Sequence, residues 1–225
     1  MVNTISKQRL ENLNCILGLD CSKYQADITW SKVKAAGVQF AFIKITEGTT
    51  GHEDNIYNVR NRVLSAQQNG VKIGYYHFAR PSLNINPEDN ANAEITNVIN
   101  HYNILPKPNF PLVLDIEAYA NNVIWNDTDH MSKYITAFIS GLKQHGISVI
   151  IYSYRSFIDT NTNHTFGSFP LFLAAYLDDP ENYQPAIPQG WNEWKIWQFT
   201  EKGQIDGYAG DIDLDIMKKD FFNNF

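Results

Sequence analysis

The stretch QQNGVKIGYYHF, residues 67–78, reads as the end of a helix, a glycine that stops the helix, and a buried strand. Gly70 fits this position because helices commonly end on a residue with positive φ, which glycine adopts without steric cost. The same order of signals recurs in KAAGVQFAFIKI (34–45) and in KQHGISVIIYSY (143–154). The recurrence predicts a chain built from repeated strand and helix units.

The spacing of the three glycines sets the length of the unit. Gly37 and Gly70 are 33 residues apart, and Gly70 and Gly146 are 76 apart, which is two units of 38. A strand, a loop, a helix and a second loop together have about this length. Further apolar runs fit the same rhythm and are predicted strands: 15–20, 111–117, 170–176, 194–199 and 211–216.

The predicted strands define the fold class. Most are near-continuous apolar runs, as in a parallel sheet that is buried on both faces. Eight such strands with crossover helices close naturally into a barrel. We therefore predict an α/β fold with a single (β/α)8-type barrel, with few or short helices in the C-terminal third. An open doubly wound sheet is the alternative, which the lack of a GxGxxG motif after a strand disfavours.

Composition excludes several classes of protein. The chain has 225 residues, 44% of them hydrophobic, and a net charge of −6 without long runs of either sign. It has no basic patch for nucleic acid and no apolar run of about 18 residues for a membrane span. The N-terminus lacks the apolar core of a signal peptide. We expect either a protein of the host cytoplasm that is released through a holin, or a protein that is exported by another non-classical route.

The two cysteines, Cys15 and Cys21, lie on one predicted strand. Six residues at about 3.3 Å each separate their Cα atoms by roughly 20 Å, whereas a disulfide needs less than about 7 Å. We expect two free and mostly buried thiols. The sequence contains no zinc-binding, phosphate-binding or serine-nucleophile motif, so neither a metal nor a cofactor is expected.

Acids and aromatic residues gather where the predicted strands end. Barrel enzymes keep their active sites at the carboxyl ends of the strands. The residues that this pattern marks as candidates are Asp20, Glu47, Tyr76, His77, Asp115, Glu117, Tyr152, Tyr176, Trp197, Gln198 and Asp213. The amino ends of the strands show no such enrichment, so the carboxyl ends are the predicted functional face.

Asp115 and Glu117 end an apolar strand. Positions i and i+2 of a strand point to one face, so both carboxyls should project into the barrel mouth, with Cα atoms about 6.6–7 Å apart. Two carboxyls this close cannot both ionise freely, so the pKa of one rises and that group can donate a proton at neutral pH. Such a pair cleaves glycosidic bonds. The alternative is that both acids face a loop and form ion pairs.

Neighbouring polar residues leave alternatives open. His77 is either a base or ligand of the site or, as is more common, a hydrogen-bonded wall residue. Lys44 and Glu47 form either a structural ion pair or contacts to a substrate. The aromatic residues at the strand ends either stack on sugar rings or pack.

Seven segments occur in a specific order: GLDCSKYQADITWSKVKAAGVQFAFIKITEG (18–48), GYYHFARP (74–81), PLVLDIEAY (111–119), VIIYSY (149–154), LAAY (173–176), WKIWQFT (194–200) and GDIDLDIM (210–217). Together they resemble glycoside hydrolase family 25, the lysozymes (muramidases) that cut bacterial peptidoglycan. The resemblance covers about residues 16–220. Residues 1–14 are then an N-terminal extension, and residues 15–225 form the expected catalytic barrel.

The resemblance implies hydrolysis of the β-1,4 bond between N-acetylmuramic acid and N-acetylglucosamine. Glu117 matches the family's general acid, and Asp115 matches its partner carboxylate. Asp20 and Asp213 match two further acids of the groove. The positions that shape the sugar sites are matched by Tyr76, Tyr152, Tyr176 and Trp197. The implied partner is bacterial peptidoglycan, and we expect a monomer.

The spacing of the acid pair bears on the mechanism. Direct attack by Asp115 needs carboxyls about 5–5.5 Å apart and inversion needs about 6.5–9.5 Å, and an i, i+2 pair lies between. The acetamido group of the substrate can instead act as an internal nucleophile. We favour this route, with Glu117 as acid and then base, Asp115 orienting the acetamido group, and retention at C1. An inactive sugar-binding barrel and another barrel glycosidase, such as a chitinase, are the competing hypotheses.

Overall fold

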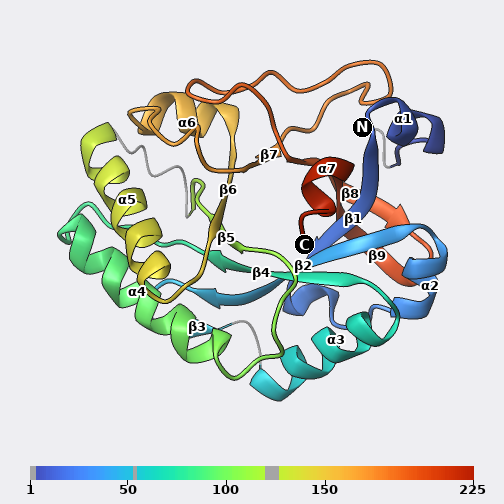
Figure 1. Ribbon diagram of the computed structural model, residues 1–225, viewed down its shortest axis with the longest axis horizontal. Helices are drawn as coiled ribbons and strands as arrows, with labels where there is room; N and C mark the ends of the chain where they lie inside the picture. Colours follow the sequence, from blue (N-terminus) through green and yellow to red (C-terminus); the bar gives the residue numbers. More distant parts are fainter. Residues whose placement is uncertain (1–3, 53–54, 120–126) are drawn as a thin grey trace.

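Backbone pairing closes the strands into a ring. The computed structural model describes residues 4–52, 55–119 and 127–225 (Figure 1). Within these residues one nine-stranded sheet has the order β1-β9-β8-β7-β6-β5-β4-β2-β3, and β1 also pairs with β2. This last pairing joins the ends of the row, and the short β3 (Gly51–His52) is attached to β2 outside the ring. The predicted (β/α)8-type barrel is confirmed.

Every predicted strand is present. The barrel strands are β1 (Cys15–Cys21), β2 (Val38–Glu47), β4 (Lys72–Phe78), β5 (Leu112–Asp115), β6 (Val149–Tyr154), β7 (Leu171–Ala174), β8 (Ile196–Ile205) and β9 (Tyr208–Lys218). Pairing is parallel from β1 through β2, β4, β5, β6 and β7 to β8. The carboxyl ends of these strands therefore meet at one mouth of the barrel.

The last strand departs from a regular strand and helix alternation. Strand β9 runs antiparallel to both of its neighbours, β8 and β1. Only Asp206 and Gly207 separate β8 from β9, and Gly207 has φ +107°. A two-residue connection can join only antiparallel strands, and Asp-Gly is a strong hairpin signal. The barrel is thus closed by a hairpin.

The helices of the described residues are α1 (Lys7–Asn12), α2 (Trp30–Ala35), α3 (Ile56–Gln68), α4 (Pro87–Tyr102), α5 (Thr128–Gln144), α6 (Arg155–Asn161) and α7 (Lys219–Phe222). The helices of the C-terminal third, α6 and α7, are short, as the sequence predicts. Gly37, Gly70 and Gly146 follow α2, α3 and α5 with φ values of +108°, +73° and +74°. The prediction that these glycines stop helices in the left-handed conformation is confirmed.

An apolar cluster of inward-pointing side chains fills the barrel below the carboxyl ends of the strands. Its buried members are Phe40, Phe42, Phe110, Val113, Ile150, Phe172, Ile196, Met217 and Phe221. Gly18 and Gly74 make room for this cluster, because a Cβ atom at either would lie 2.2 Å from the ring of Phe40 or Phe42. Outward-pointing side chains pack instead with the helices in a second, larger cluster.

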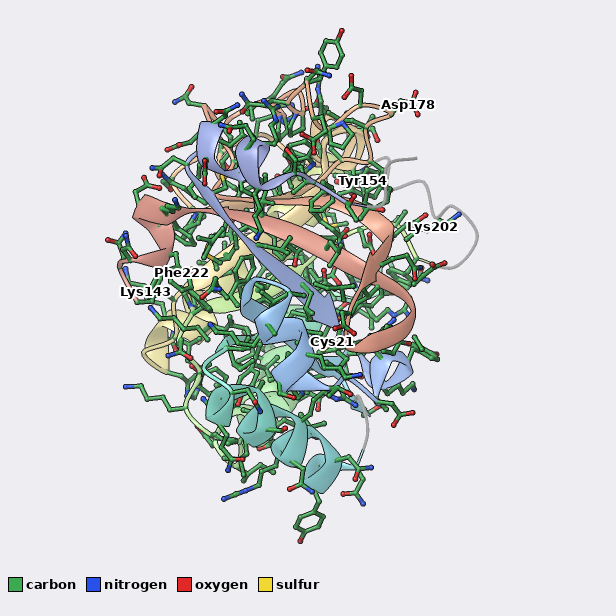
Figure 2. All side chains as sticks on the ribbon, turned by 90° about the vertical axis from the view of Figure 1, so that its right-hand side faces the viewer. Cys21, Lys143, Tyr154, Asp178, Lys202 and Phe222 are labelled. Atoms are coloured by element: carbon green, nitrogen blue, oxygen red, sulfur yellow. The ribbon has the colours of Figure 1, made fainter. Side chains whose placement is uncertain are left out.

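The two ends of the barrel differ. Figure 2 places Cys21 and Tyr154, the last residues of β1 and β6, on one side of the molecule and Lys143 and Phe222 at the other. Helix α7 lies over the middle of the ring in Figure 1, and its Phe221 packs into the interior cluster. Helix α7 therefore leaves the carboxyl ends of the strands uncovered, and a cavity can open there. In the described part of the chain, no helix combines the length and the apolar character needed to cross a membrane.

The cysteines and the N-terminal segment have defined surroundings. Cys15 and Cys21 are free and buried, as predicted. Helix α1 is tied to a loop after β7, because the Arg9 guanidinium donates from Nε to the Pro180 carbonyl (3.1 Å) and from Nη2 to the Tyr183 carbonyl (2.7 Å). Helix α1 of the N-terminal extension therefore packs against the barrel.

Candidate active site

A cavity of about 280 Å³ opens at the carboxyl ends of the strands. Its lining residues are Asp20, Ser22, Phe42, Lys44, Tyr76, Phe78, Val113, Asp115, Glu117, Tyr152, Phe172, Tyr176, Gln198, Glu201 and Asp213. The structure thus brings together all four carboxyls predicted to act in catalysis, three predicted tyrosines and Gln198. Parallel strands produce this convergence, because their carboxyl ends share one edge.

Asp115 and Glu117 both face the cavity, as strand alternation predicts. Burial, followed by the charges of Glu117 and Asp20, raises the pKa of Asp115 well above its ordinary value of 3.8. Burial and the charge of Asp20 raise the pKa of Glu117 from 4.5 to about 7. With a pKa of about 7, Glu117 is partly protonated at neutral pH. The pair is therefore able to donate a proton.

Asp115 is the deeper member of the pair. It is 7% exposed, and its Oδ1 has no hydrogen-bond partner among the described residues. A buried carboxyl oxygen without a partner is costly unless a ligand completes it. The floor of the cavity thus offers one hydrogen-bonding position to a bound molecule.

A second pair of carboxyls, Asp20 and Asp213, lies on the opposite wall. The two residues are cross-strand neighbours on β1 and β9, and their side chains share a hydrogen bond. Burial raises the pKa of Asp20 from 3.8 to about 6. Burial and then Asp20 raise the pKa of Asp213 from 3.8 to about 9. Asp213 is therefore the proton donor and Asp20 the acceptor.

Gln198 fixes the position of Asp20. Its Oε1 accepts hydrogen bonds from the hydroxyls of Tyr152 (2.8 Å) and Tyr176 (2.6 Å), so its amide nitrogen must point the other way. That nitrogen donates to Asp20 Oδ2 at 2.6 Å. Two of the aromatic residues predicted to contact sugar thus also orient an acid.

Cations occupy one rim of the cavity. Lys44 lines the cavity and donates to Glu47 Oε2 at 2.7 Å, and Arg80 Nε donates to Glu47 Oε1 at 2.9 Å. Burial alone would raise the pKa of Glu47, but the hydrogen bonds from Lys44 and Arg80 lower it. Lys44 and Arg80 also lower the pKa of both Asp115 and Glu117.

Three predicted contacts to substrate do not fit the positions of their residues. Glu47 lies beside the cavity, held by the two cations, and does not line it. His77 and Trp197 are fully buried on the outer side of the barrel wall. The reason is strand alternation, because their neighbours Tyr76 and Gln198 take the inward positions. His77 and Trp197 therefore do not line the cavity in which the sequence predicts substrate contacts.

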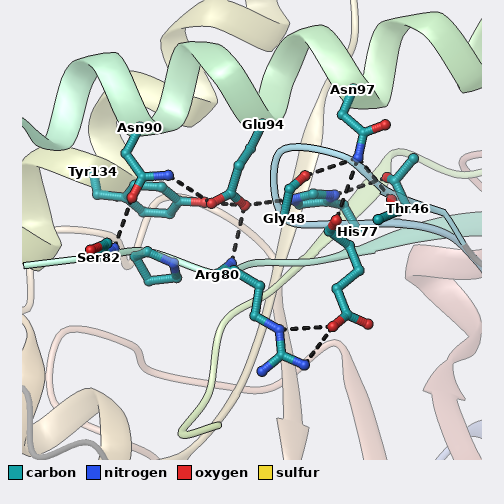
Figure 3. Close-up of polar contacts among 12 residues, drawn as sticks. Thr46, Gly48, His77, Arg80, Ser82, Asn90, Glu94, Asn97 and Tyr134 are labelled. Atoms are coloured by element: carbon teal, nitrogen blue, oxygen red, sulfur yellow. Dashed lines mark hydrogen bonds and ion pairs between the residues drawn. The ribbon is translucent and has the colours of Figure 1, made fainter. Parts of the chain in front are cut away.

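His77 belongs instead to a buried network that joins helix α4 to the strand ends (Figure 3). Its Nε2 lies 2.8 Å from Glu94 Oε2, and its Nδ1 lies 2.8 Å from Thr46 Oγ1. The same Glu94 oxygen accepts from the Tyr134 hydroxyl at 2.8 Å and from the Arg80 amide at 3.1 Å. The alternative of a hydrogen-bonded wall residue is thus the observed one.

Some lining residues were missed from the sequence. Phe42, Val113 and Phe172 are apolar and were assigned to strand interiors, although each lies two or four positions before another lining residue, namely Lys44, Asp115 and Tyr176 in turn. Glu201 was missed because the predicted strand stopped at residue 199, whereas β8 continues to Ile205 as a hairpin arm. Alternation would have identified the first three residues, and the Asp-Gly turn would have extended β8.

Known proteins are similar to this chain in sequence and in fold. Residues 19–208 match the sequence profile of Glycosyl hydrolases family 25. The chain belongs to this family. The match spans the strands that carry Asp20, Asp115 and Glu117, and it ends at the start of β9.

Relatives of this family 25 chain include proteins named as a lysozyme and a muramidase. Lysozyme M1 of Streptomyces globisporus is 30% identical over 206 residues, which are 88% of this chain and 66% of that protein. This chain thus spans just under two thirds of that relative. The N,O-diacetylmuramidase of Chalaropsis sp is 28% identical over 217 residues, 91% of this chain and 98% of that enzyme. The bacterial lysozyme from Streptomyces coelicolor superposes with a TM-score of 0.73 and 28% identity, over 90% and 91% of the two chains.

Proposed function

We propose that this family 25 glycoside hydrolase is a muramidase. It cleaves the β-1,4 bond between N-acetylmuramic acid and N-acetylglucosamine in bacterial peptidoglycan. The observation that carries the proposal is the pair Asp115 and Glu117, which sits in an acid-lined cavity where the pKa of both carboxyls is raised. The lysozyme and muramidase names of its relatives supply the substrate class.

Glu117 acts as the general acid in this proposal. It follows the end of β5 and is less buried than Asp115, so it is the member of the pair that reaches the leaving oxygen. Its pKa of about 7 suits a group that gives and takes a proton at neutral pH. Glu117 protonates the departing sugar, then deprotonates the incoming water.

Asp115 orients the acetamido group of the substrate. Its unpartnered Oδ1 accepts the acetamido N–H, which turns the acetamido oxygen toward C1. This hydrogen bond favours the ionised form of Asp115 and leaves the proton of the pair on Glu117. The acetamido oxygen then closes onto C1 as the glycosidic bond breaks, and water reopens the ring with net retention.

The remaining cavity residues bind the sugars. Tyr76, Tyr152 and Tyr176 present aromatic surface to the sugar rings, and Asp20 and Asp213 offer hydrogen bonds to hydroxyl groups. One chain supplies every residue of this set, so we propose a monomer in which residues 15–225 form the catalytic unit. Its place of action is the bacterial cell wall, reached through a holin or another non-classical route.

Two digestions test the activity. Purified peptidoglycan and chitin are each incubated with the protein, and the new reducing ends are identified by mass spectrometry. Reducing muramic acid from peptidoglycan alone supports the proposal. Reducing glucosamine from peptidoglycan, or cleavage of chitin only, would replace it with a glucosaminidase or a chitinase. Binding to the cell wall without any cleavage would indicate a sugar-binding barrel.

A variant and a stereochemical measurement test the mechanism. Glu117→Gln should lower kcat by about 10²–10⁴-fold while binding to the cell wall persists. Glu88→Gln, at an exposed position on α4, is the control and should keep full activity. Proton NMR of the first product should show the β anomer, and an initial α anomer would exclude retention.

A further inference from the structure

A carboxyl group that the proposed mechanism does not use lies beneath the cavity. Asp215 is fully buried on β9, opposite Gly18 of β1 and Gln198 of β8. Directly opposite residues of antiparallel strands share one face, so Asp215 points into the barrel with Gln198. Two residues earlier Asp213 lines the cavity, and two residues later Met217 joins the apolar cluster. Asp215 thus separates the acidic layer of the barrel from the apolar layer.

Neither oxygen of Asp215 has a hydrogen-bond partner among the described residues. Opposite it, Gly18 offers no side chain, and the Gln198 amide is committed to Asp20 and the two tyrosines. A buried polar group without a partner costs about 1–3 kcal/mol, and its persistence calls for an explanation. The explanation that fits this site is a partner that becomes available only when substrate binds.

The two charges that raise the pKa of Asp215 are negative. They are Asp20 from β1 and Asp213 from its own strand, while β8 contributes the uncharged Gln198. Across the cavity, β2 presents Lys44 and β5 presents Asp115. Burial, Asp20 and Asp213 together raise the pKa of Asp215 well above 3.8. The raised pKa favours the protonated form of Asp215, which has an O–H to donate.

The register places Asp20 as the acceptor for this O–H. Asp20 is the diagonal neighbour of Asp215 on the same face, at a Cα separation of about 7–8 Å, and it acts on Asp215 more strongly than Asp213 does. In the free protein Asp20 accepts from Gln198 and from Asp213. A sugar hydroxyl that accepts the O–H of Asp213 would remove the hydrogen bond from Asp213 to Asp20. Asp20 would then need another donor.

We propose that Asp215 is a positioning residue that stays uncharged beneath the Asp20–Asp213 pair and donates its O–H to Asp20 when a bound sugar takes the hydrogen bond of Asp213. No proton is transferred in this step, since Asp213 and Asp215 each only redirect an O–H. The exchange keeps the Asp20 carboxylate in place. The negative charge of Asp20 in turn raises the pKa of both Asp115 and Glu117. This raised pKa helps Glu117 to keep the proton that it donates in the reaction.

This inference rests on the proposed muramidase function, and two variants test it. Leucine has the branched shape of aspartate without a donor, and asparagine keeps a donor that cannot ionise. Asp215→Leu should fold and lower kcat on peptidoglycan at least tenfold. Asp215→Asn should stay within about threefold of the wild type. The control is Asp211→Asn, at an exposed position of the same strand, which should leave kcat unchanged.

Unfolding measurements give a readout that is independent of activity. The thermal midpoints of the wild type and of Asp215→Asn are compared at pH 5 and pH 9. Because only the wild type can ionise at this position, the variant should gain stability over the wild type as the pH rises. A difference that does not change with pH would overturn the uncharged state of Asp215.

The activity results separate this inference from the muramidase proposal. Full activity of Asp215→Leu, or equal losses in the Leu and Asn variants, would overturn the donor role while leaving the muramidase intact. A wild type that cuts no peptidoglycan would remove the proposed function, and the unfolding comparison would still decide whether Asp215 is uncharged.

Discussion

The charge around a single residue, Glu117, decides when the proposed acid holds its proton. Burial and Asp20 raise its pKa, whereas Arg80 and Lys44 lower it. Lys44→Met removes one of the two cations and leaves Glu47 paired with Arg80. The pKa of Glu117 should therefore rise, and the alkaline limb of the pH profile of kcat/KM should move to higher pH. The measurement is hydrolysis of peptidoglycan between pH 5 and 10.

Lys133→Met is the matched control for Lys44→Met. Lys133 forms an exposed ion pair with Asp129 on α5 and does not line the cavity. Its removal should leave the profile unchanged. An alkaline limb that stays in place in Lys44→Met, or that shifts equally in the control, would contradict the role of Lys44.

Gly18 is required by packing inside the barrel. A Cβ atom there would lie 2.2 Å from the Phe40 ring, which is itself fully buried in the interior cluster. Gly18→Ala should cost about 1–3 kcal/mol of the free energy of unfolding, measured with urea. Adding Phe40→Leu should recover part of that loss, because the smaller side chain makes room. Additive losses in the double variant would show that the ring is not the obstacle.

At the scale of elements, strand alternation explains which site residues the sequence could predict. Asp20, Asp115 and Glu117 were correctly assigned to the cavity, because an acidic side chain at a strand end is rarely accommodated elsewhere in a barrel. His77 and Trp197 were not, because an aromatic or imidazole side chain suits either face of a barrel wall. Only the register, which the three-dimensional pairing sets, separates the two faces.

The network around Glu94 ties a helix to the barrel wall, and its removal should destabilise the protein. Tyr134→Phe deletes the 2.8 Å hydrogen bond from a fully buried hydroxyl to Glu94 Oε2 (Figure 3). The expected loss is about 1–3 kcal/mol in the free energy of unfolding. Tyr57→Phe, at a hydroxyl-bearing residue that is 72% exposed, should change stability by less than about 0.5 kcal/mol. Equal effects of the two substitutions would contradict a stabilising network.

At the scale of the whole molecule, the barrel was predicted, whereas its closure by a hairpin was missed. The repeated glycine and strand pattern predicts parallel units, and these account for β1 through β8. The hairpin that reverses β9 depends on two residues, Asp206 and Gly207, which are a local signal within a long loop-rich region. Asp215 could not be singled out either, since its lack of a partner is a property of the closed ring.

The acidic layer makes the stability of the whole molecule depend on pH. The pKa values of Asp20, Glu117 and Asp213 rise to about 6, 7 and 9 in the folded protein, from ordinary values of 3.8, 4.5 and 3.8. The folded state therefore binds more protons than the unfolded state between pH 4 and pH 9. Stability that is present at the acidic end of this window should be lost as the pH rises through each folded pKa.

The unfolding midpoint should accordingly be lower at pH 9 than at pH 5. A single retained unit of pKa shift corresponds to about 1.4 kcal/mol, and about 2–4 °C of midpoint accompanies each kcal/mol in a chain of this size. Glu47 does not oppose the trend, because its lowered pKa stabilises the fold equally throughout this range. Replacing the three acids by Asn, Gln and Asn should flatten the dependence. A wild-type midpoint that is constant or rises from pH 5 to pH 9 would show that the cavity does not hold these protons.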